Sequence, residues 1–162
     1  MTHGIVPQQL AVTMSGREFL EAMIAGRLPQ PPIAHALTFR LVEAGEGTAV
    51  FEGEPGAHLL NPAGVVHGGW ALTLIDSATG CAAHTLLASG VRYTTLETKA
   101  NFSRVIRPDT GRVRAAGRVV TKGRQIITAE ATVSAHDGRV LAHGTSTLLI
   151  LTSDGQTGAG QG

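Results

Sequence analysis

The stretch HGGWALTLIDSATGCAAHTLLA, residues 67–88, decides the fold of this chain. It is too long for one strand, is rich in Ala and Leu, and is apolar on nearly every side, which predicts a buried helix that begins at or near His67. A helix without a polar face must be surrounded by other elements. One carboxylate, Asp76, stands in its middle, and burying a lone acid costs free energy unless the acid has a partner.

The rest of the chain reads mainly as strands. Two alternating segments, 35–43 and 47–54, predict a hairpin. Four further strand-like segments follow the helix, at about 93–105, 112–122, 125–136 and 139–151. Turn signals at 123–124 and 137–138 predict that the last three form an antiparallel meander. One sheet wrapped around one helix, in the order β-β-α-β-β-β-β, is the α+β architecture called the hotdog fold.

The two ends of the chain have different patterns. Ser15 and Glu18 form a capping-box pattern that opens a short helix ending near Gly26. The prolines in segment 30–35 predict an extended connector. No apolar anchor follows Leu151, which predicts disorder. We therefore expect three parts: an N-terminal segment with a short helix (1–34), the hotdog domain (35–151) and a disordered tail (152–162).

Composition excludes several classes of protein. The 162 residues suit a single domain. A formal net charge of +1 gives no overall field for nucleic acid or an anionic membrane. The single cysteine, Cys81, excludes an internal disulfide, and the chain shows neither a secretion signal nor an apolar run of about 18 residues. We expect a soluble cytoplasmic protein.

The start of the predicted helix is a candidate anion site. Gly68 and Gly69 leave the first backbone N–H groups uncovered, and such groups attract an anion or a developing oxyanion. Alternatively, the glycines only allow close packing. Nine positions separate His67 from Asp76, which places them on opposite faces of the helix and about 13 Å apart along its axis. They can serve one reacting group only if a second copy of the chain supplies the helix start, so we predict a site at a dimer interface.

A purely structural role for Asp76 is the alternative, in which the acid is hydrogen-bonded to Thr73, Thr79 or the backbone. The sign of any shift in its pKa does not follow from the sequence, because burial and a partner's N–H groups act in opposite directions.

Three stretches carry a resemblance to a known family: NPAGVVHGGWALTLIDSATG (61–80), YTTLETKANFSRVIRP (93–108) and DGRVLAHGTSTLLI (137–150). Together they resemble the hotdog acyl-CoA thioesterases of the phenylacetate-degradation (PaaI) type, relatives of one lineage of 4-hydroxybenzoyl-CoA thioesterases. The likeness spans about 36–151. Its most specific part is the Asn-x-x-Gly-x-x-His-Gly-Gly pattern with an acid nine positions after the histidine.

The resemblance implies a role for each matching residue. Asp76 would be the catalytic carboxylate, either a general base on water or a nucleophile on the thioester carbon. Gly68 would offer its N–H to the thioester oxygen. Asn61 would help to hold the water or the carbonyl, and His67 would shape the turn that aims the Gly68 N–H. Thr95 matches a strand position where some members carry a hydroxyl.

Candidates for the phosphates of coenzyme A share one face of the segment 112–122. They are Arg112, Arg114, Arg118 and Lys122. A solvated sheet face is the plainer interpretation, and Arg104, Arg107 or Arg124 could serve instead. The seven histidines show no spacing typical of a zinc site, so we expect neither a metal nor a cofactor.

We therefore predict an acyl-CoA thioesterase that releases a carboxylic acid and free coenzyme A, as a homodimer that assembles into a homotetramer. One alternative is a hotdog enoyl-CoA hydratase, which would want a histidine beside the acid. His84 lies eight residues beyond Asp76, two turns away, and is poorly placed for that. The other alternative is a non-catalytic acyl-CoA-binding module.

Overall fold

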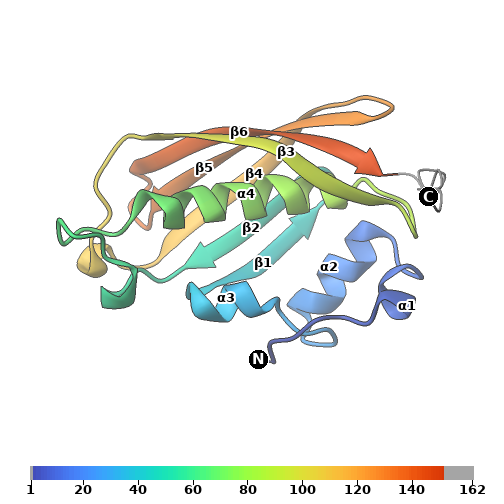
Figure 1. Cartoon of the computed structure of the whole chain (residues 1–162), viewed down its shortest axis with the longest axis horizontal. Helices are drawn as coiled ribbons and strands as arrows, with labels where there is room; N and C mark the ends of the chain where they lie inside the picture. Colours follow the sequence, from blue (N-terminus) through green and yellow to red (C-terminus); the bar gives the residue numbers. More distant parts are fainter. Residues whose placement is uncertain (1, 152–162) are drawn as a thin grey trace, which may run out of the picture.

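The computed structural model describes residues 2–151 (Figure 1), so the predicted tail at 152–162 lies outside the described residues. Six strands form one antiparallel sheet in the order β1-β2-β4-β5-β6-β3. The strands are β1 (Phe39–Gly45), β2 (Thr48–Gly53), β3 (Arg92–Phe102), β4 (Val113–Lys122), β5 (Ile126–Ala135) and β6 (Val140–Leu151). The meander predicted from the turn signals is confirmed, and so is the hotdog fold class.

The long helix α4 (Gly68–His84) lies along one face of this sheet and packs against all six strands (Figure 1). Leu74, Ile75 and Ala78 on its inner side are completely buried. Full burial of one Leu or Ile side chain contributes about 1.5–3 kcal/mol. The sequence predicts a helix that is surrounded on every side, but a stripe that includes Leu72, Asp76 and Ser77 is only half-buried within this chain.

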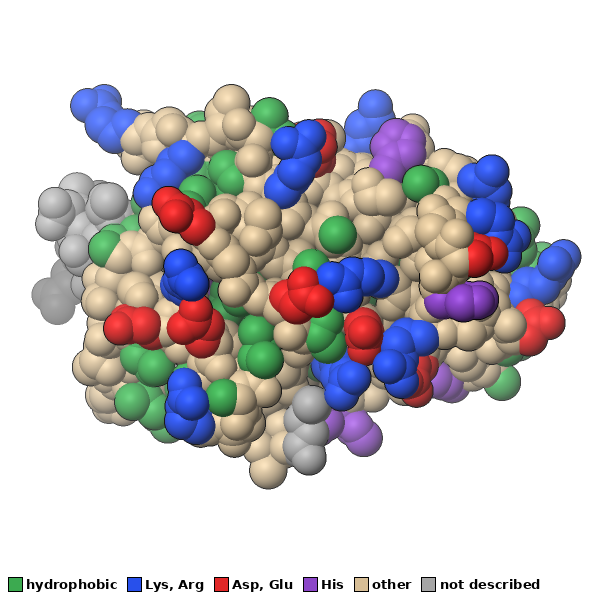
Figure 2. Space-filling view, turned by 180° about the vertical axis from the view of Figure 1, so that it is seen from behind, with side chains coloured by type: hydrophobic (Ala, Val, Ile, Leu, Met, Phe, Trp, Pro, Cys, Tyr) green, Lys and Arg blue, Asp and Glu red, His purple; other side chains and the backbone are tan. Residues whose placement is uncertain are grey.

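Small residues on the inner face of the sheet let α4 approach closely. Ala115, Ala129 and Ala131 are at most 3% exposed. Gly117 on β4 lies directly against the backbone carbonyl of Ala78, where a Cβ atom would collide with it. The opposite face of the sheet is charged: basic and acidic side chains lie next to one another on it when the molecule is viewed from behind (Figure 2).

The N-terminal segment covers one edge of the sheet. Helix α2 (Gly16–Ile24) begins at the predicted capping box, in which Ser15 N–H donates to Glu18 Oε2 over 2.8 Å and Glu18 N–H donates to Ser15 Oγ over 3.3 Å. This helix and α3 (Pro32–Ala36) both pack against β1. Strand β3, at the other edge, has a neighbour in the described chain on one side only.

Short helical segments account for the differences from the sequence prediction. The connector predicted at 30–35 is extended only to Pro31, because a proline at the first position of a helix lacks an N–H that would be unpaired there anyway. Strand β1 consequently begins at Phe39 and not at His35. One further helix, α1 (Gln8–Ala11), and two 3-10 turns, η1 (Ala57–Leu59) and η2 (Pro108–Thr110), complete the secondary structure. Within residues 2–151, no helix is both long enough and apolar enough to cross a membrane.

The close contact at Gly117 predicts a loss of stability on adding a single methyl group. Gly117→Ala should lower the free energy of unfolding by about 1–3 kcal/mol, because neither the sheet nor the carbonyl of Ala78 can move without disturbing the core. Urea denaturation followed by circular dichroism measures this change. Ala116→Ser, one residue away on the exposed face, is the control and should stay close to wild type; equal stabilities for all three proteins would contradict the prediction.

Candidate active site

Asp76 lies in the middle of α4 and receives a hydrogen bond from the sheet. The hydroxyl of Thr98 on β3 donates to Asp76 Oδ1 over 2.9 Å. Behind it, Thr98 Oγ1 lies 3.0 Å from the hydroxyl of Ser146 on β6, which lies 2.7 Å from the hydroxyl of Thr79. Thr79 is 0% exposed and Ser146 is 2% exposed. The acid is therefore joined to a row of three hydroxyls, of which Thr98 is half-buried and the other two are buried, whereas only Thr73 and Thr79 were considered from the sequence as its side-chain partners.

A β-bulge explains why Thr98, and not Thr95, is the hydroxyl beside Asp76. Thr95 pairs with Leu148, but the register shifts before Glu97, which pairs with Thr147. The extra residue, Leu96, changes which positions face α4. Simple alternation from Thr95 would point Glu97 inward and Thr98 outward, so the bulge could not be predicted from the residue pattern. In the structure Leu96 is 57% exposed.

The start of α4 leaves one backbone N–H group free within residues 2–151, and its role as an anion site stays a prediction. His67 is the N-cap residue, and its Nδ1 atom accepts a hydrogen bond from Gly69 N–H over 2.8 Å. Trp70 N–H donates to the carbonyl of His67 over 2.9 Å. The N–H of Gly68 is then left without an acceptor in the part of the chain that the structure describes. A free N–H at a helix start carries a partial positive charge.

Asn61 holds the loop that precedes this helix start. Its Oδ1 atom accepts hydrogen bonds from Ala63 N–H over 2.9 Å and from Val65 N–H over 3.3 Å. The two main-chain bonds Asn61 N–H to Val65 O and Gly64 N–H to Asn61 O close the same turn. Because the side-chain oxygen is engaged, the NH2 group of Asn61 is the part of this amide that can donate to a substrate.

An open cavity of about 350 Å³ lies beside Gly68. Asn61 and His67 line it together with Gly68, and its apolar walls include Phe102, which is 57% exposed. Arg104 also lines it, with a guanidinium that donates to the carbonyl of Val140 over 2.7 Å. Asp76 is not among the lining residues. The structure thus brings Asn61, His67 and Gly68 together and leaves the acid elsewhere on the helix.

Of the four cations proposed for coenzyme A, three lie on the outer face of the sheet, and all four are already engaged. Arg114 pairs with Glu43 over 2.7 Å, and Arg118 pairs with Glu130. The prediction that Lys122 shares their face is wrong, because the register of β4 shifts between Val119 and Thr121 and Lys122 therefore pairs with buried Ile127 on the α4 side. There it donates to the carbonyl of Leu86 over 2.6 Å. Exposed ion pairs of this kind contribute at most about 1 kcal/mol each, but a phosphate would have to compete with the carboxylates.

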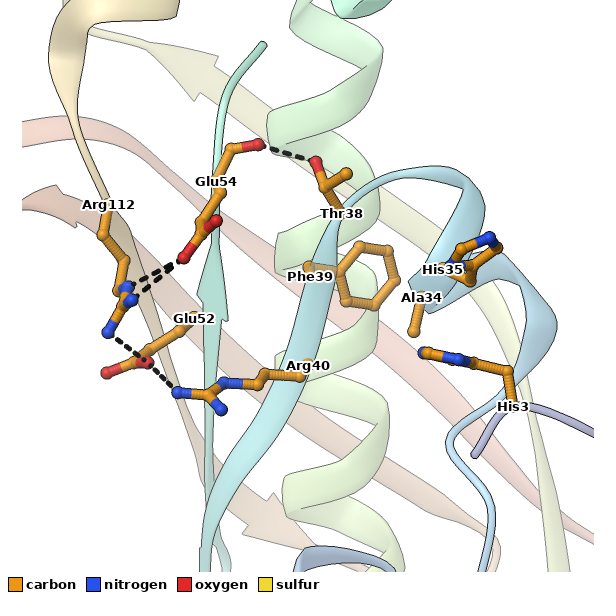
Figure 3. A pocket seen from close by; sticks show the side chains of 9 residues that line it. All are labelled: His3, Ala34, His35, Thr38, Phe39, Arg40, Glu52, Glu54 and Arg112. Carbon is orange, nitrogen blue, oxygen red and sulfur yellow. Dashed lines mark hydrogen bonds and ion pairs between the residues drawn. The ribbon is translucent and has the colours of Figure 1, made fainter. Parts of the chain in front are cut away.

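Arg112 lies in a second open cavity, of about 290 Å³, on the β1, β2 and β4 side of the molecule (Figure 3). There it pairs with Glu54 over 2.9 Å and with Glu52 over 3.4 Å, and Glu52 also pairs with Arg40. These cations and carboxylates contact one another directly on one side of the cavity, and His3 and His35 lie on the other, as Figure 3 shows. The cavity therefore has little net charge with which to attract an anionic ligand.

Three titratable side chains gather near the C-terminal end of α4. Burial lowers the pKa of His84, whose ring packs between Phe19 and Tyr93 with centroids 5.6 Å and 5.5 Å away. Burial also raises the pKa of Tyr93, and the neighbouring Cys81 and Asp76 add to that effect. A neutral His84 enclosed by aromatic rings does not provide the histidine that a hydratase needs. No group of three or more metal-ligating side chains is found in residues 2–151.

Comparisons with known proteins agree with this geometry. Residues 63–142 match the sequence model of the thioesterase superfamily. A conserved protein from Pseudomonas aeruginosa is 32% identical with a TM-score of 0.69, over 74% of this chain and 94% of that one. A mutant of the phenylacetic acid degradation protein PaaI from Thermus thermophilus is 30% identical with a TM-score of 0.67, over 74% and 99%. A Streptococcus mutans protein bound to acetyl CoA is 25% identical with a TM-score of 0.64, over 70% and 89%.

No curated protein sequence matches the chain significantly. The sheet, the central helix and these likenesses nevertheless agree on one class of enzyme. The chain belongs to the thioesterase superfamily and, within it, to the hotdog thioesterases of the phenylacetate-degradation type.

The environment of Cys81 predicts that its thiol is unreactive in the folded protein. Burial, with a smaller contribution from the charge of Asp76, raises its pKa to about 12, so almost no thiolate forms near pH 8. A chromogenic disulfide reagent should react with the native enzyme at least about 100-fold more slowly than with the enzyme in denaturant. Rapid labelling of the native protein would contradict this, and Cys81→Ala is the control that identifies the reacting thiol.

Proposed function

We propose that the enzyme hydrolyses an acyl-CoA thioester at a site built from two copies of the chain. Asp76 of one copy would act as the base, and the Gly68 N–H of the other would bind the thioester oxygen. The observation that carries this proposal is that two functional groups lie apart within one chain. One is the Asp76 carboxylate, which accepts a hydrogen bond from Thr98, and the other is the free N–H at the start of α4. The acetyl CoA bound to the Streptococcus mutans relative supports coenzyme A as the thiol part of the substrate.

The chemistry follows from the positions of these groups. The carboxylate of Asp76 takes a proton from water, and the water oxygen attacks the thioester carbon. Negative charge then grows on the carbonyl oxygen, where the N–H of Gly68 and the dipole of α4 stabilise it. The NH2 group of Asn61 donates to the same oxygen or to the water. As the tetrahedral intermediate collapses, the carbon–sulfur bond breaks and the proton held by Asp76 passes to the sulfur.

Two surfaces of the chain support association of two copies. The edge of β3 is eleven residues long and is unpaired by any other strand of residues 2–151, whereas helices cover the β1 edge. An open edge of that length with exposed Leu96 is a template for another strand. The half-buried stripe of α4 that carries Asp76 is the second surface. Pairing of two β3 edges would cover both the edge and the stripe of α4. Assembly of two such dimers into a tetramer remains a prediction from the family resemblance.

The cavity beside Gly68 is the proposed place of entry for the substrate. Its apolar residues, Val65, Val105 and Ile106 among them, suit an acyl or pantetheine chain. Arg104 is the cation in this lining, so we propose it for a coenzyme A phosphate ahead of the other four candidates. Those are Arg112, Arg114 and Arg118, which are paired with carboxylates on the outer face of the sheet, and Lys122, which is bound to the carbonyl of Leu86.

The carboxylate is tested by its closest uncharged replacement. Asp76→Asn should lower kcat by at least about 10³-fold, because the amide cannot take a proton, while binding of coenzyme A stays within about threefold. Thiol release from a panel of acyl-CoAs of varied length and aromaticity measures turnover, and calorimetry measures binding. Retained turnover would contradict the role of Asp76. In a single turnover in ¹⁸O-water, label in Asp76 would identify a nucleophile whose anhydride is hydrolysed at the aspartyl carbon and would contradict the role of a base.

Sharing of the site between two chains is tested by mixing inactive variants. Asp76→Ala removes the base, and Gly68→Pro removes the N–H at the first helical position, where proline suits the backbone. The added ring requires a small shift of the exposed side chain of Phe102, whose ring would lie 3.1 Å from the new Cβ atom. Randomly mixed dimers should regain about a quarter of wild-type activity, because half are mixed and each mixed dimer holds one intact site. Size-exclusion chromatography controls for folding and assembly. If both variants are folded but their mixture shows no activity, Asp76 and the Gly68 N–H do not act together across an interface between two chains.

A further inference from the structure

The row of hydroxyls behind Asp76 contains one more hydrogen-bonding contact than it has protons. Four contacts run in series: Asp76 Oδ1 to Thr98 over 2.9 Å, Thr98 to Ser146 over 3.0 Å, Ser146 to Thr79 over 2.7 Å, and Thr79 to the helix backbone. The last contact is shared between two carbonyls, that of Ile75 over 2.9 Å and that of Asp76 over 3.1 Å, and is counted once because one proton serves both. Each hydroxyl can donate only once. With Asp76 ionised, three protons must serve four contacts, so one contact has no proton.

The contact between Thr79 and the carbonyl of Ile75, at the end of the row away from Asp76, can be left without a proton at the lowest cost in free energy. The carbonyl of Ile75 lies one helical turn before Thr79 in α4, where it also accepts from the helix backbone. If Thr79 turns its proton to Ser146, then Ser146 donates to Thr98 and Thr98 donates to the carboxylate. All three hydroxyl dipoles then point at the negative charge, and hydrogen bonds in such a chain strengthen one another.

The opposite direction fits the protonated acid. A proton on Asp76 Oδ1 donates to Thr98, which donates to Ser146, then to Thr79, and finally to the carbonyl of Ile75. Four protons now serve four contacts, and no heavy atom has to move. Only rotation about three C–O bonds separates the two arrangements.

We propose that Thr98, Ser146 and Thr79 form a reversible hydroxyl relay that holds Asp76 in both protonation states during turnover. This inference rests on the proposed role of Asp76 as the base. The proton from water goes to Asp76 Oδ1, its O–H turns toward Thr98, and it turns back to the substrate before the proton leaves with the sulfur of coenzyme A. Each hydroxyl keeps its own proton and only changes its acceptor. Thr98 contacts the acid directly, and Ser146 and Thr79 are positioning residues that act through it.

The relay predicts a graded loss of kcat with distance from Asp76. Thr98→Val should lower kcat roughly 10- to 100-fold, the effect of losing one hydrogen bond to a charged group. Ser146→Ala should lower it about 3- to 10-fold, and Thr79→Val less, because each acts only by orienting the next hydroxyl. KM should stay within about twofold throughout, since none of the three hydroxyls lies in the substrate cavity.

The matched control removes one hydroxyl of a hydrogen-bonded pair on the other face of the same sheet. Thr128 Oγ1 lies 2.6 Å from the hydroxyl of Thr121, with no connection to Asp76. Thr128→Val should therefore leave kcat unchanged. Thr98→Ser, which keeps the hydroxyl, should restore most of the activity lost in Thr98→Val. Urea denaturation of every variant shows whether it is folded at the assay temperature.

A double-mutant cycle separates the relay from a general effect on packing. Once Thr98 cannot donate, the orientation of Ser146 no longer matters, so Thr98→Val with Ser146→Ala should have the kcat of Thr98→Val alone. Additive losses, a change confined to KM, or a wild-type kcat in Ser146→Ala would each overturn the relay. Those results leave the proposed function intact if Asp76→Asn is inactive; an active Asp76→Asn enzyme is the separate result by which the proposed function itself fails.

Discussion

The contact between α4 and the sheet is the constraint on which the rest of this structure depends. The helix is apolar on nearly every side, and the sheet removes only its inner side from water. Alanines and Gly117 line the sheet so that the helix can lie close to it. Close approach is also what brings hydroxyls from β3 and β6 within hydrogen-bonding distance of Asp76 and Thr79. The packing of the core and the support of the acid are therefore one arrangement.

The same helix carries two chemical groups that one chain keeps apart. Its start offers the N–H of Gly68, because the ring of His67 accepts a hydrogen bond from Gly69 N–H and not from Gly68. Its middle offers Asp76 on the stripe that the sheet leaves half-buried. A rigid helix cannot bend these groups together, so a reaction that needs both must use two helices. The open β3 edge, beside a β1 edge that α2 and α3 protect, gives a physical reason for a second copy to bind on that side.

Charge has little part in shaping the outer face. Its arginines and glutamates neutralise one another between different strands (Figure 2), which keeps that face hydrated without creating a strong field. The one cation in the cavity lining beside Gly68, Arg104, comes from the loop after β3 and not from the strand whose arginines stand out in the sequence. The regular spacing of arginines in the segment 112–122 therefore indicated a strand face exposed to water and not a ligand-binding site.

The sequence by itself determined the hotdog topology, the capping box at Ser15, the helix start at His67 and the position of the acid, because hydrophobic periodicity and turn residues are local properties of the chain. It could not determine which hydroxyl reaches Asp76, because a bulge at Leu96 reverses the alternation of β3, nor that Ser146 lies behind it, 48 residues beyond Thr98. It also could not show that most of the strand arginines already have carboxylate partners, since those partners lie on other strands. Contacts between distant segments depend on register, and register is settled only when the sheet closes over the helix.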